Sequence, residues 1–120
     1  PVVTVEDPYT PSTYNDPDFT ETAMAHFRTR FGEDRVMQVP SVMSAEDFGQ
    51  FRRAAPDDVE SLIFWVGGVP QEQLDKAAAG EGSLPSLHSP FWAPDAEKVI
   101  ATGAEGLASA ALTLMPARGG

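Results

Sequence analysis

The run "SLIFWVGG", residues 61–68, constrains the fold most, because it is nearly all apolar and rich in β-prone residues. A short run of this kind is typical of a strand that is covered on both faces of a sheet. The two glycines at its end permit a sharp turn of the backbone. We therefore predict a buried strand here, and two shorter strands over 2–5 and 35–40.

Helical patterns separate these predicted strands. Residues 18–30 place Ala23 and Phe27 on one face, and Gly32 is positioned to end the helix. His26 lies on the same apolar side, and we interpret it as a half-buried helix residue because no partner carboxylate is spaced around it.

Two further helices are predicted. Ser44 and Asp47 form a start that resembles a capping box, and a short helix follows them. Apolar residues recur at helical spacing between Asp95, which can cap the helix, and Met115. Residues 69–94 show no clear periodicity and are expected to form a long, functional loop.

Helices that alternate with buried strands predict an α/β fold with a layered sheet. In such folds, ligands bind at the carboxyl ends of the strands. The segment 44–47 and the segment around His88 each follow a predicted strand. We therefore expect these two segments to meet at one edge of the sheet.

The net charge of −10, from 18 acidic and 8 basic residues, disfavours binding to nucleic acid or to an anionic membrane surface. No cysteine is present, so disulfides and thiolate metal sites are excluded. No apolar run reaches the roughly 18 residues that span a bilayer. These features predict a cytoplasmic protein without a membrane span.

His88 lies in the stretch "SLPSLHSPFWAPD", between Pro85 and Pro90. Histidine is the commonest neutral metal ligand, and the two prolines stiffen the loop that carries it. No other His, Asp or Glu stands at ligand spacing, so a structural histidine remains an alternative. The chain has no other complete catalytic or phosphate-binding motif.

Four segments, taken in order, resemble one enzyme family: "TYNDPDFT", "VMSAEDFGQF", "FWVGG" and "LHSPFWAPDAEKVIATGAEGLASAALTLM". They are similar to the C-terminal third of the dinuclear-metal amidohydrolases and peptidases related to aminoacylase, hippurate hydrolase and carboxypeptidase-type enzymes. The resemblance covers nearly the whole chain. It implies a partial three-layer, zinc-peptidase-like catalytic domain, preceded by the last strand of a small lid domain.

By this resemblance, His88 matches the last metal ligand of a pair of zinc or manganese ions. Ser44, Ala45 and Glu46 match a loop that lines the substrate cleft, although Ser44 and Ala45 stand where the family has Gly-Ser. Asp47 and Phe48 are expected to shape this loop. The implied reaction is hydrolysis of the amide bond of an N-acyl amino acid or small peptide by a metal-bound water.

The resemblance also implies a division of the chain. Residues 1–6 would end the lid domain, 7–17 would be a linker, 18–115 the C-terminal part of the catalytic domain, and 116–120 a tail. The chain begins within a strand pattern, and we expect the remaining ligands and the general base in a preceding segment. Alone, it is then expected to be inactive and prone to aggregate, because a half-sheet exposes a strand edge.

The expected partners are therefore the substrate, the remainder of the catalytic domain and, through the lid domain, a second copy of the enzyme. The alternative is a non-catalytic, acidic α/β module that binds a partner or small ligand and in which His88 is structural.

Overall fold

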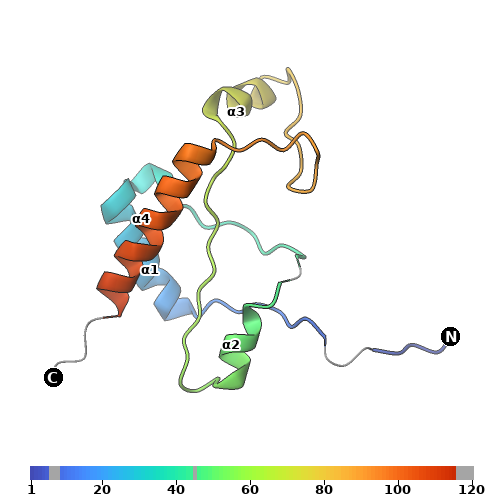
Figure 1. Cartoon of the computed structure of the whole chain (residues 1–120), viewed down its shortest axis with the longest axis vertical. Helices are drawn as coiled ribbons and strands as arrows, with labels where there is room; N and C mark the ends of the chain where they lie inside the picture. Colours follow the sequence, from blue (N-terminus) through green and yellow to red (C-terminus); the bar gives the residue numbers. More distant parts are fainter. Residues whose placement is uncertain (6–8, 45, 116–120) are drawn as a thin grey trace. The chain divides into compact units, whose positions relative to one another are not determined.

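The computed structural model describes residues 1–5, 9–44 and 46–115. This part of the chain forms four α-helices and one 3-10 helix, η1 (Figure 1). The chain divides into two compact units, Pro1–Phe64 and Trp65–Gly120. The first unit contains α1, η1 and α2, and the second contains α3 and α4. No helix in the described ranges is both long and apolar enough to cross a bilayer.

Helix α1, Pro17–Phe31, confirms the first predicted helix. Proline suits its first position because the N–H that proline lacks would have no partner in the helix there. Gly32 ends the helix with a φ of 104°, a conformation that glycine adopts without steric cost, and its N–H donates to the Arg28 carbonyl. Arg28 also lies 3.6 Å from Glu33, the first residue of η1 (Glu33–Arg35).

The first unit has a small apolar core on α1. Ala23 is fully buried and Phe27 is 7 % exposed, as the predicted apolar face requires. The Phe27 ring lies 5.1 Å from the Phe64 ring and 6.0 Å from the Phe31 ring, measured between centroids. Phe64 comes from the apolar run, so that run does contribute to a core.

The predicted α/β fold is wrong, because no residue in the described ranges belongs to a strand. The prediction of a partial three-layer domain, led by a lid-domain strand, is wrong with it. In the predicted strand 61–68, the Ser61 carbonyl accepts from the Asp16 N–H at 2.9 Å. The Asn15 side chain donates to the Ile63 carbonyl and accepts from the Ile63 N–H, both at 2.9 Å. The Asp16 backbone and the Asn15 side chain thus bond to backbone groups that a neighbouring strand would otherwise use.

The two shorter predicted strands are also absent. Residues 2–5 are exposed, and 35–40 begin within η1 and then continue without regular structure. Both segments carry β-prone side chains. A strand exists only when a second strand pairs with its backbone, and the described residues offer these segments none.

Helix α2 is shorter than its sequence pattern predicts. It spans Gly49–Ala54, and its N-cap is Phe48, which makes no hydrogen bond through its side chain. The predicted capping box of Ser44 and Asp47 is therefore not formed. Phe48 and Phe51 do share a face, with ring centroids 5.9 Å apart.

The second unit contains a helix in a segment that was predicted to form a loop. Helix α3, Gln71–Ala78, lies within the predicted loop 69–94. Two pairs of side chains four residues apart stabilise it: Gln71 with Asp75 at 2.8 Å, and Lys76 with Glu72 at 2.6 Å.

Helix α4, Ala96–Leu114, confirms the last predicted helix and its cap. The Asp95 carboxylate accepts from the Lys98 N–H at 3.3 Å and pairs with the Lys98 ammonium at 2.8 Å. The Asp95 N–H donates to the Gly68 carbonyl at 3.1 Å, which joins the start of α4 to the end of the apolar run. Gly68 also lies against Trp92, so that a Cβ added at Gly68 would stand 3.1 Å from the ring.

Candidate functional site

Two consecutive turns hold the loop that carries His88. The Ser89 N–H donates to the Ser86 carbonyl at 2.9 Å, which places His88 at a central position of the first turn. The Trp92 N–H donates to the Ser89 carbonyl at 3.0 Å and closes the second turn. Ser89 also stiffens this second turn, because its hydroxyl accepts from the Phe91 N–H at 3.2 Å. The backbone beneath the imidazole is therefore fixed on both sides.

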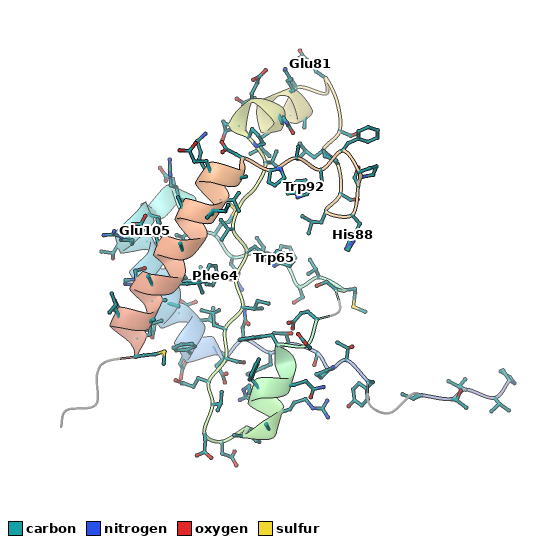
Figure 2. All side chains as sticks on the ribbon, in the orientation of Figure 1. Phe64, Trp65, Glu81, His88, Trp92 and Glu105 are labelled. Carbon is teal, nitrogen blue, oxygen red and sulfur yellow. The ribbon has the colours of Figure 1, made fainter. Side chains whose placement is uncertain are left out.

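The His88 side chain is exposed and projects from this loop (Figure 2). Its ring makes no hydrogen bond, ion pair or ring contact with any residue that the structure describes. His26, the other histidine, differs in this respect: it is half-buried on α1, and its ring lies 5.6 Å from the Phe27 ring. Both nitrogens of His88 are thus available to a ligand from outside the described chain.

The predicted substrate loop, 44–46, belongs to the first unit. Ser44 is exposed, and Ala45 lies outside the described residues. The Glu46 carboxylate accepts from the Thr13 hydroxyl and, at 2.7 Å, from the Phe48 N–H. These bonds lower the pKa of Glu46, the one from Thr13 most strongly, against a smaller opposing effect of burial. Glu46 therefore stays ionised and fixes the start of α2 to the segment around Thr13.

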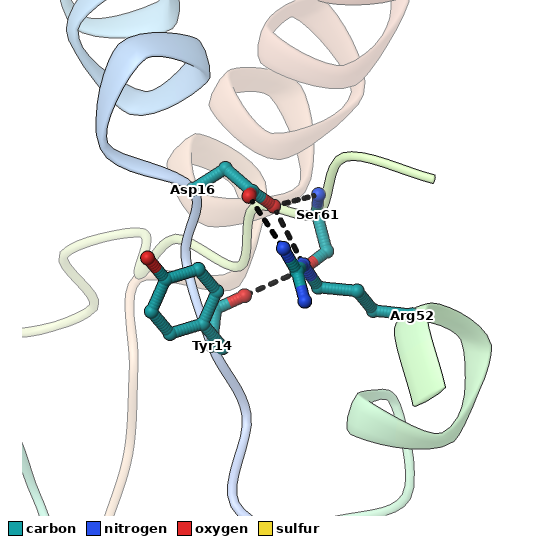
Figure 3. Close-up of polar contacts among 4 residues, drawn as sticks. All are labelled: Tyr14, Asp16, Arg52 and Ser61. Carbon is teal, nitrogen blue, oxygen red and sulfur yellow. Dashed lines mark hydrogen bonds and ion pairs between the residues drawn. The ribbon is translucent and has the colours of Figure 1, made fainter. Parts of the chain in front are cut away.

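Asp16 is the centre of a second polar cluster in the first unit, shown in Figure 3. Its carboxylate accepts from two nitrogens of Arg52, each at 3.0 Å, and from the Ser61 N–H at 2.8 Å. The Arg52 guanidinium also stacks on the Tyr14 ring, 4.8 Å from its centroid. The Ser61 hydroxyl donates to the Tyr14 carbonyl. The cluster thus joins three segments far apart in sequence.

This geometry explains the charge state of the Asp16 cluster. The bonds from Arg52, and then the bond from Ser61, lower the pKa of Asp16 more than partial burial raises it. The pairing raises the pKa of Arg52 in return. Both groups are therefore charged at neutral pH, and the fork of the guanidinium meets the carboxylate in the bidentate arrangement that gives strong hydrogen bonds.

The sequence does not predict this cluster. Asn15 and Asp16 fall in the predicted linker, 7–17. Ser61 is only the first residue of the predicted strand, and Arg52 has no expected role. The one local signal is the Asp-Pro step before α1, and that step predicts a helix start only. Nothing at this site in the sequence indicates a partner 36 residues away.

Gly49 permits the close packing of α2 against the segment that leads to Asp16. A Cβ at this position would lie 2.7 Å from the Ser12 carbonyl oxygen, which belongs to the backbone. We predict that Gly49→Ala destabilises the first unit by about 1–3 kcal/mol, because the two segments must move apart. Thermal unfolding followed by circular dichroism measures this loss. Gly67→Ala is the control, because a Cβ there meets nothing within 4 Å, and an equal loss in both variants would contradict the prediction.

In the described ranges, no group of three or more His, Cys, Asp or Glu side chains is arranged to hold a metal ion. His88 therefore stands as one candidate ligand without further ligands around it. Ser44 and Glu46 belong to the first unit, whereas His88 belongs to the second. No protein-family model matches the chain, and no solved structure matches it significantly.

Proposed function

We propose that this chain is the C-terminal part of a metal-dependent amidohydrolase that cleaves the amide bond of N-acyl amino acids or small peptides. Two lines support the proposal. The four resembling segments occur in the family's order along nearly the whole chain. In addition, the residue that matches a metal ligand is exposed on a braced turn with both ring nitrogens free of described partners.

The environment of His88 is the observation that carries the proposal. A histidine kept for structure is normally buried at least in part and hydrogen-bonded through its ring, because an unpaired buried nitrogen is costly. His88 has neither property among the described residues. This favours a ligand over the alternative, a non-catalytic module in which His88 is structural.

A single imidazole suits a shared metal site but not a complete one. Catalytic zinc takes about three protein ligands, so the other donors come, under this proposal, from residues outside the chain. When bound, a pair of divalent ions would supply positive charge to the substrate carbonyl and would lower the pKa of a bound water. The role of His88 is to present one ring nitrogen, and the turns 86–89 and 89–92 limit the freedom that it loses on binding.

Ser44 and Glu46 have different roles under this proposal. The Glu46 carboxylate is occupied by Thr13 and Phe48, so it anchors the start of α2. Ser44 is exposed and carries the hydroxyl that can contact a substrate directly. Ala45 remains a predicted contact, outside the described residues.

The test compares His88→Gln with His26→Gln in the complete enzyme to which this chain would belong. Glutamine preserves polarity and removes the imidazole in both variants. We expect His88→Gln to lose about one of two bound metal ions per chain, measured by elemental analysis after gel filtration. His26→Gln should keep both, because His26 is half-buried on α1 against Phe27.

Unchanged metal content in His88→Gln would remove His88 from the metal site and leave the alternative module as the better interpretation. Equal losses in the two variants, together with lower melting temperatures, would also contradict the ligand role. In that case the metal would be lost through unfolding and not through a missing ligand.

A further inference from the structure

A pocket of about 260 Å³ lies in the first unit, between α2 and the segment that precedes α1. The residues that line it are Ser12, Tyr14, Gly49, Arg52, Arg53 and Pro56. Drug-sized ligands occupy cavities of roughly 300–1,000 Å³, so this pocket suits a smaller molecule. None of these residues has a part in the proposed metal site.

Of the two arginines at the pocket, Arg52 is already neutralised. Asp16 pairs with the Arg52 guanidinium through two hydrogen bonds, and the face of the guanidinium lies over the Tyr14 ring. The negative charge of Asp57 also acts on Arg52. Arg52 is therefore a fixed wall of the pocket with little charge left to attract a ligand.

Arg53 has no such partner. Its guanidinium stacks over the Tyr9 ring, 5.2 Å from the centroid, and one of its nitrogens donates to the Tyr9 hydroxyl at 3.0 Å. It forms no ion pair with any carboxylate that the structure describes. A guanidinium carries five N–H donors, and stacking on Tyr9 holds it in one plane. Arg53 is thus a preoriented cation with donors to spare.

The other lining groups favour an organic anion over an inorganic one. The Tyr14 ring and the Pro56 ring offer apolar surface, and Ser12 adds a hydroxyl. The planar fork of arginine matches a carboxylate in the bidentate manner. We propose that this pocket binds a small carboxylate that carries an apolar or aromatic group, with the carboxylate on Arg53 and the apolar part against Tyr14 and Pro56. This proposal is independent of the metal site.

The test is a titration of the full 120-residue chain with benzoate, followed by the amide and guanidinium NMR signals of α2. Benzamide has the same shape without the charge, and acetate has the charge without the ring. We expect saturable shifts with benzoate, and binding about tenfold weaker for both comparison compounds. The loss of affinity with benzamide measures the contribution of the carboxylate contact to Arg53. The loss of affinity with acetate measures the contribution of the apolar walls.

Arg53→Gln should weaken benzoate binding by about tenfold. Arg35→Gln is the matched control, because it removes the same charge from an exposed position of the same unit that does not line the pocket. Equal weakening in the two variants would mean that general charge attraction accounts for the binding, and would overturn the proposal. Benzoate shifts that do not saturate would also overturn the proposal. Equal binding of benzoate and benzamide by the unaltered chain would overturn it too, and this comparison does not depend on a variant.

Discussion

Replacing Phe27 with alanine should lower the free energy of unfolding of the first unit by about 3–5 kcal/mol. Truncation of a buried phenylalanine costs about 3–5 kcal/mol, through lost burial and the cavity that remains. Ordinary domains gain about 0.05–0.15 kcal/mol per residue, which gives a 64-residue unit only about 3–10 kcal/mol in total. Because Phe27 is the larger of the two residues that form the apolar core described in this unit, one substitution removes a large share of its stability.

The measurement is hydrogen exchange of the α1 amides, with circular dichroism to follow the loss of helix. Phe51→Ala is the matched control: it makes the same change in the same unit, at a side chain that is 69 % exposed. Surface substitutions usually change stability by about 0.5 kcal/mol or less. The α1 amides could keep their protection from hydrogen exchange in Phe27→Ala, or lose it equally in the two variants. Either result would show that the unit does not depend on the contact between α1 and Phe64.

Helices α1 and α4 were predictable because their signals are local. The apolar spacing of α1, the glycine at its end and the aspartate at the start of α4 lie within the segments they describe. Helix α3 also has a local signal, the pairs four residues apart, although residues 69–94 as a whole were expected to form a loop.

The absence of strands from the described residues was not predictable in the same way, because β-structure depends on a partner. The apolar run 61–68 has the composition of a buried strand, and composition cannot show what its backbone will bond to. Here Asn15 and Asp16 bond to it. In the sequence, a polar pair before a proline is typical of a turn. In the folded chain, the same two residues bond to the backbone of residues 61 and 63.

The candidate sites follow the same rule. His88 could be found from its two neighbouring prolines, and the structure places it in a braced turn. The pocket at Arg53 could not, because it needs Tyr9 and Tyr14 to lie beside a helix more than 30 residues later in the chain. Only the folded arrangement shows that Asp16 neutralises Arg52, whereas Arg53 forms no ion pair with a described carboxylate.

The Asp16 cluster should make the first unit sensitive to acid. Because Arg52 and Ser61 lower the pKa of Asp16 from its ordinary value of 3.8, the folded state binds this proton less readily than the unfolded state does. The stabilisation is fully present above that ordinary value and is lost as the pH falls through the lower folded pKa. Glu46, whose pKa is lowered from 4.5 chiefly by Thr13, adds a loss of the same sign.

Asp16→Asn separates this effect from general acid unfolding. The amide cannot carry the negative charge that Arg52 requires, so we expect the melting temperature at pH 7 to fall by several degrees. Between pH 6 and pH 3 the variant should lose less stability than the unaltered chain, because one of the responsible carboxylates is gone. Asp58→Asn is the control, since the Asp58 side chain is exposed and makes no hydrogen bond or ion pair with a described residue. If Asp16→Asn lost as much stability in acid as the unaltered chain, Asp16 would not be a source of the acid sensitivity of the first unit. Glu46 would then be the remaining source of that sensitivity.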